Sequence, residues 1–147
     1  MKNARLWFHR VSYLQYPFFL MGVFYAYRPL LNSLDLLWVD MNRGLVFLGL
    51  GISLSTLQDT TKTQNNFSKR IFQHERYSKI FMLVLIVQIL LYTFGGLWAF
   101  LMMESGPLYD LSFGLISVGI GMIGLLKGAI EIATHLQSQP MLEEPRS

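Results

Sequence analysis

The sequence predicts an all-α integral membrane protein, a four-helix bundle that crosses a lipid bilayer four times. Three observations predict this class. Apolar residues make up 52% and charged residues only 14% of the 147 residues, against about 25% charged in ordinary soluble domains. The apolar residues gather in segments of about 20 residues, the length that spans hydrocarbon as a helix. The basic residues lie almost entirely at one side of these segments.

The first predicted helix covers about residues 12–31. Basic residues precede it, so a secretory signal peptide is the alternative interpretation. The apolar stretch is long and bulky, however, and no small-x-small cleavage site follows it, since Ala26 is flanked by Tyr25 and Tyr27. We therefore expect an uncleaved membrane helix.

The second predicted helix covers about residues 36–57, and the sequence allows two forms for it. Its uncharged part, Gly44 to Leu57, is 14 residues long and too short to span hydrocarbon alone. A full crossing places Asp40 and Arg43 inside the helix, and a re-entrant or interfacial segment is the alternative. We expect the full crossing because of the internal repeat described below.

The third and fourth predicted helices cover about residues 80–103 and 108–130. The third contains 24 residues without a charge, which reach about 36 Å at 1.5 Å per residue. Residues 1–136 are thus predicted to form one four-span transmembrane domain. Residues 137–147, with two prolines, are predicted to be a disordered cytoplasmic tail.

Orientation follows from the placement of lysine and arginine, which favour the cytoplasmic side. Of the 12 basic residues, those in the outer connections are Arg28 and Arg43 alone. The others lie at the ends and in the loop between the second and third helices: Lys2, Arg5, Arg10, Lys62, Lys69, Arg70, Arg76, Lys79, Lys127 and Arg146. Both termini are expected to be cytoplasmic, in the inner membrane of a bacterium.

A shift of 70 residues superposes the second helix on the fourth. The matched positions are Asp40, Gly44, Gly49 and Gly51 over Asp110, Gly114, Gly119 and Gly121. Matched glycines in step with an aspartate indicate two repeated transmembrane hairpins. Both copies would enter the membrane in the same direction, unlike the halves of inverted-repeat transporters.

Glycines mark the faces on which membrane helices approach closely, because lipid supplies no hydrophobic force between helices. The predicted helix-packing residues are Gly44, Gly49, Gly51, Gly114, Gly119, Gly121, Gly124 and Gly128. They pack either within one chain or between subunits. We expect Gln88, in the third helix, to contribute to packing, where it can hydrogen-bond to a neighbouring helix.

A candidate polar site lies near the outer ends of the first two helices: Arg28, Asp35, Asp40 and Arg43. Ionisable groups at membrane depth are functional candidates, because burying them unpaired is costly. One interpretation is a site for an ion, a proton or a small anion that opens to the outer face. The other is a structural ion pair at headgroup level, with Asp40 and Arg43 paired at a spacing of three on one helix.

The inner loop becomes basic and amphipathic toward its end, where Phe67, Ile71 and Phe72 alternate with charges. Its predicted membrane-surface residues are Lys69, Arg70, Arg76 and Lys79, placed to lie on an anionic leaflet. A surface for a cytoplasmic partner is the alternative.

No pattern in the sequence predicts catalysis, a metal or a cofactor. There is no cysteine, and His9, His74 and His135 lie in different segments without metal-site spacing. The motif from Gly119 to Gly124 matches the dinucleotide-binding pattern by letter, but it lacks the preceding strand. The net charge of +3 orients the chain and does not indicate nucleic-acid binding.

We therefore expect a non-enzymatic accessory or structural subunit that assembles through its glycine-faced helices. Its expected partners are the lipid bilayer and either further copies of itself or a larger membrane complex. The alternative is a small oligomeric channel or carrier for an ion or small solute, built on the candidate polar site. A membrane-embedded enzyme is the third possibility.

Overall fold

The computed structural model describes residues 10–31, 34–57, 72 and 74–138. Their elements are α2 (Gln15–Leu31), the short 3-10 helix η1 (Leu34–Leu36), α3 (Leu37–Ser55), α5 (Glu75–Met102) and α6 (Pro107–Ser138). These described residues are helical throughout their length except for short connections, and they include no strand. The predicted all-α class is confirmed.

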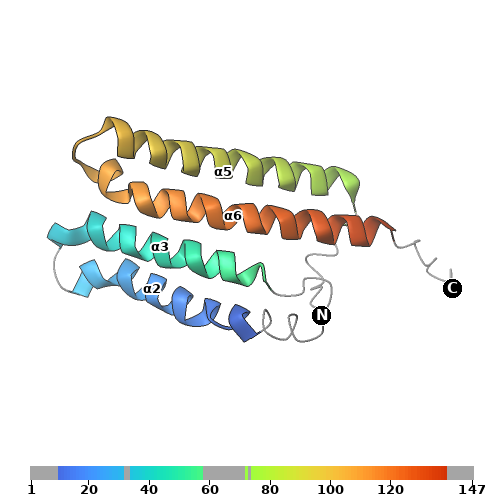
Figure 1. Ribbon diagram of the computed structural model, residues 1–147, viewed down its shortest axis with the longest axis horizontal. Coiled ribbons are helices and arrows are strands. Elements are labelled where there is room, and N and C mark those ends of the chain that lie inside the picture. The colour runs from blue at the N-terminus through green and yellow to red at the C-terminus, as the bar shows by residue number, and fades with distance from the viewer. Residues whose placement is uncertain (1–9, 32–33, 58–71, 73, 139–147) are drawn as a thin grey trace.

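The four long helices lie side by side in one row, in the order α2, α3, α6, α5 (Figure 1). Helix α3 packs against α2 and α6, and α5 packs against α6. The arrangement is more open than the predicted bundle, because α2 and α5 lie at opposite edges of the row (Figure 1). The start of α2 and the end of α6 lie at the same end of the molecule (Figure 1).

Within the described residues, three helical segments are long and apolar enough to cross a membrane: Leu34–Ser55, Glu75–Met102 and Pro107–Ser138. Helix α2 has 17 residues and begins later than predicted because of Pro17. Proline has no N–H to donate to the carbonyl four residues earlier. The backbone instead turns through bonds such as Tyr16 N–H to Tyr13 O, 3.2 Å, and Tyr13 N–H to Arg10 O, 3.2 Å.

Helix α3 runs without a break through Asp40 and Arg43 and ends at Ser55. Together with η1 it gives a segment of 22 residues. The uncharged part that looked too short is therefore the C-terminal part of a longer helical segment.

Helices α5 and α6 extend farther than their apolar segments. Helix α5 begins at Glu75, whose carboxylate accepts a hydrogen bond from Lys79 Nζ at 2.6 Å, a pairing that supports a first turn. Helix α6 begins at Pro107, the position that tolerates proline best, after Gly106 with a φ of 112°. It continues to Ser138 and so includes the first two residues, 137 and 138, of the predicted tail; the rest of that tail, residues 139–147, lies outside the described part.

The best-buried apolar cluster lies along α5 and α6, and Phe72 packs onto it. The α5 residues that face α6 recur at alternating steps of four and three: Ser78, Met82, Leu85, Ile89, Tyr92, Gly96 and Ala99, all buried or half-buried. This spacing is typical of helices that cross at about 20°. Most other large apolar side chains on the four helices are exposed, an arrangement that a water-soluble protein avoids.

Candidate functional site

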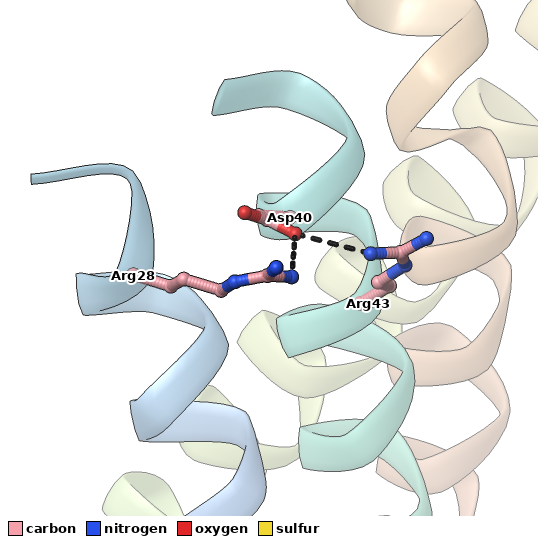
Figure 2. A network of polar contacts seen from close by, with 3 residues as sticks. All are labelled: Arg28, Asp40 and Arg43. Carbon is pink, nitrogen blue, oxygen red and sulfur yellow. Dashed lines mark hydrogen bonds and ion pairs between the residues drawn. The ribbon is translucent and has the colours of Figure 1, made fainter. Parts of the chain in front are cut away.

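The candidate polar site is centred on Asp40, in the first turn of α3. Its Oδ1 atom accepts a hydrogen bond from Nη1 of Arg28 at 3.2 Å and from Nη1 of Arg43 at 3.3 Å (Figure 2). Arg28 reaches across from α2, whereas Arg43 lies one turn along α3. The cluster therefore links the two helices of the first hairpin near their connection.

The three side chains differ in exposure. Only 4% of the Asp40 side chain is exposed, against 35% for Arg28 and 51% for Arg43. A buried carboxylate is stable when it is paired and hydrogen-bonded, and here two guanidinium groups pair with it. Because there are two cations for one anion, one unit of positive charge remains uncompensated on the exposed side.

An aromatic platform, which the sequence analysis did not identify, supports both arginines. The guanidinium carbon of each arginine lies 5.9 Å from the ring centroid of Tyr25, within the range of a cation–π contact. Tyr25 in turn stacks on Phe47 of α3, with ring centroids 5.5 Å apart and planes inclined by 4°. The three-residue step from Tyr25 to Arg28 is the signal that could have indicated this contact.

Asp35 does not join the cluster. It lies exposed in η1 and forms no ion pair within the described part of the chain. Asp110, which the repeat matches to Asp40, is half-buried in the first turn of α6 and likewise has no ion pair among the described residues. The site is thus a three-residue cluster in the first hairpin only.

The structure places the predicted packing glycines at contacts between helices of the same chain. A Cβ atom added to Gly49 would meet backbone atoms of Ser117 in α6 at 2.5 Å, and one added to Gly121 would meet the Gly49 carbonyl oxygen at 2.6 Å. The other glycines with such contacts are Gly44 and Gly51 against α2, Gly114 and Gly124 against α3, and Gly119 against α5. Gly128 lies half-buried on α6.

Glycines matched by the repeat face the same direction along the row. Gly44 and Gly51 of α3 face α2, and their counterparts Gly114 and Gly121 of α6 face α3. Gly49 faces α6, and its counterpart Gly119 faces α5. Each central helix therefore uses one glycine face toward one neighbour and a second glycine face toward the other.

Polar side chains form hydrogen bonds between the two central helices, α3 and α6. Asn42 Oδ1 accepts a hydrogen bond from the Gly114 N–H at 2.6 Å, and Ser117 Oγ donates to the Val46 carbonyl at 3.3 Å. The sequence analysis did not identify Asn42, because a single asparagine beside two charged residues looks like part of the polar cluster. These bonds place α3 and α6 in a defined register.

The predicted membrane-surface residues are only partly described. Arg76 and Lys79 are exposed in the first turns of α5, while Lys69 and Arg70 lie outside the described residues. Phe72 is buried, with its ring at right angles to that of Phe81 at 5.5 Å, and its carbonyl accepts a hydrogen bond from Gln137 at 3.5 Å. This phenylalanine therefore packs on the protein and does not face a membrane surface.

The described residues contain no group of three or more histidine, aspartate and glutamate side chains that could hold a metal ion. The exposed ion pair Lys127–Glu131, at 3.7 Å in the C-terminal part of α6, joins two side chains of one helix. Comparison with known protein families, curated proteins and solved structures gave no match to this chain.

Proposed function

We propose that this protein is a non-enzymatic integral membrane protein that crosses the bilayer four times and acts as an accessory or structural subunit. The observation that carries the proposal is the exposure of large apolar side chains on all four long helices. Exposed apolar patches of this extent mark contact with lipid or with other proteins. Helix α5 is apolar on every side, as expected of a helix within a membrane.

Four crossings with both termini in the cytoplasm are part of the proposal. Helix α2 and the turns before it give a helical path from Arg10 to Leu31, which is 22 residues, about 33 Å at 1.5 Å per residue. Among the described residues, the other basic side chains lie toward the opposite end of the helices from the Arg28–Asp40–Arg43 cluster: Arg10, Arg76, Lys79 and Lys127. The common direction of the matched glycines supports an origin by duplication of a two-helix unit.

In this proposal the glycine faces hold the helices of one chain together, and other surfaces serve assembly. The Arg28–Asp40–Arg43 cluster closes the outer end of the first hairpin as a structural clamp. Its buried carboxylate is already bound by two guanidinium groups, which leaves it poorly suited to bind a further cation.

The proposal is tested by fractionation, reporter fusions and gentle detergent extraction. The chain should stay in the membrane pellet at alkaline pH. Reporters fused to the two termini should both be cytoplasmic, and a reporter inserted after Ser105 should be on the other side. Native mass spectrometry after extraction should show an assembly larger than one chain. Recovery in the soluble fraction, or termini on opposite sides, would contradict the proposal.

A second candidate function is a channel or carrier for a small anion, favoured by the uncompensated positive charge at the cluster. The two functions respond differently to mutation. For a carrier, Asp40→Asn or Arg43→Gln should alter anion flux into vesicles while assembly persists. For a structural subunit, no flux should depend on Asp40, and Gly121→Leu should destabilise the fold of the single chain, because Gly121 contacts Gly49 of the same chain.

A further inference from the structure

A polar side chain lies on the outer surface of α5 at the middle of the helix. Gln88 is 13 residues from Glu75 and 14 from Met102, about 20 Å from either end. It is exposed, and its amide has no hydrogen-bond partner within the part of the chain that the structure describes. The neighbouring helix to which Gln88 was expected to hydrogen-bond is therefore not among the described helices of this chain.

In the proposed membrane orientation, this position lies within the hydrocarbon, 8 residues or about 12 Å from the inner end of the uncharged segment 80–103. An amide without a partner is costly there, because lipid tails offer neither a donor nor an acceptor. Helices in membranes satisfy such groups by hydrogen-bonding across to another helix.

The residues around Gln88 form an exposed stripe along one flank of α5, the Gln88 stripe. Each member except Met102, the last residue of α5, comes directly before a residue that faces α6, so the stripe repeats the same alternating steps of four and three. Its members are Tyr77, Phe81, Val84, Gln88, Leu91, Gly95, Trp98 and Met102, and all of them are exposed. This is the spacing with which one helix packs along another.

Gly95 lies two turns from Gln88 on the same stripe. A Cβ atom added there would meet nothing within 4 Å, in contrast to the adjacent Gly96, where it would meet the Ser112 carbonyl oxygen of α6 at 2.8 Å. Gly95 is thus a small residue on an open surface, the kind of position at which a second helix approaches closely.

We propose that a second copy of this chain packs against the Gln88 stripe, so that α5 pairs with α5 in a parallel, two-fold symmetric dimer. The proposal rests on the proposed insertion in the membrane. Two copies inserted in the same orientation, and related by an axis along the membrane normal, carry each residue at equal depth. Gln88 then meets Gln88 of the other copy. An amide both donates and accepts, so the two side chains satisfy each other.

The other edge of the row does not offer this complementarity. The exposed residues of α2 include Tyr16, Leu20, Tyr27 and Leu30, and none is an amide. A single polar residue within an apolar contact between helices is also known to fix their register and the number of helices that associate. The Gln88 stripe therefore specifies which face of α5 forms the contact and that the partner is a second copy of this chain.

The test is disulfide cross-linking in native membranes, and the chain has no cysteine of its own. Val84→Cys and Leu91→Cys place a thiol on the stripe at either side of Gln88. Ile86→Cys and Leu90→Cys are matched controls at the same depth on the opposite flank, where both residues are also exposed. Stripe cysteines should give a dimer on mild oxidation, and control cysteines should not.

Gln88→Leu, added to Leu91→Cys, should lower the dimerisation constant about 3- to 30-fold, while Gln88→Asn should retain more of it. Equal cross-linking on both flanks, no cross-linking on the stripe, or cross-linking to a different protein would overturn the symmetric dimer. Fractionation of the same membranes separates the two proposals. Loss of the chain from the alkaline pellet refutes membrane insertion, whereas retention without stripe cross-links refutes only the dimer.

Discussion

Substitution of one glycine at the α3–α6 contact tests the close approach on which the row of helices depends. In Gly121→Ala the new Cβ atom would lie 2.6 Å from the backbone carbonyl oxygen of Gly49 and 3.3 Å from Cβ of Ile52. The first distance is 0.8 Å shorter than the 3.4 Å at which ordinary contact begins. Because the obstacle is backbone, the helices themselves must separate.

The size of the effect follows from two opposing contributions. Overpacking of a close contact costs about 1–3 kcal/mol, while replacing a mid-helix glycine with alanine stabilises the helix by about 0.5–1 kcal/mol. Gly95→Ala is the matched control, because it gains the same helix preference and its Cβ atom meets nothing within 4 Å. The free energy of unfolding of Gly121→Ala should therefore lie about 1–3 kcal/mol below that of Gly95→Ala.

The assay is unfolding by sodium dodecyl sulfate in mixed micelles, followed by circular dichroism, with few enough chains per micelle to keep them monomeric. Gly95→Ala should be at least as stable as the unmodified chain. If the two variants unfolded with free energies within about 0.5 kcal/mol of each other, the close contact of α3 with α6 through Gly121 would be wrong.

Three further substitutions are expected to separate structural contacts from solvated ones in the same unfolding assay. Asp40→Asn should destabilise the chain by about 1–3 kcal/mol, because it leaves two guanidinium groups without their anion, whereas the exposed Asp35→Asn should change the free energy of unfolding by less than about 0.5 kcal/mol. An equal effect of both would contradict the clamp. Asn42→Leu should cost about 1–2 kcal/mol, because it removes the acceptor of a backbone N–H in α6; an unchanged stability would show that this bond is dispensable. Glu131→Gln should have an effect below about 1 kcal/mol, since its pair with Lys127 is exposed, and a larger loss would indicate a buried role for that carboxylate.

Local sequence predicted the helices better than it predicted their ends. The third helix was predicted to begin at about residue 80 and the fourth to end at about residue 130, but α5 begins at Glu75 and α6 ends at Ser138. Ion pairs at a spacing of four lie in both extended regions. In the first helix the opposite happened, since Pro17 delays the regular α-helix to Gln15 although the apolar stretch begins earlier.

The polar site could be predicted in part. The three-residue step joins Asp40 to Arg43 on one helix, but the contact from Arg28 depends on how α2 and α3 pack. The same limit explains why Asp35 was included with them, because nearness in sequence does not show that η1 turns its side chain outward.

The sequence by itself determined that the chain forms long apolar helices, where its charges gather, and which positions carry glycines in register. Only the tertiary structure decided which helices are neighbours, that seven of the predicted packing glycines contact other helices of their own chain, and that Gln88 faces outward. The physical reason is that lipid is as apolar as leucine. In a soluble helix the apolar stripe identifies the buried face, but in α5 every face is apolar, so the pattern cannot tell a lipid contact from a helix contact.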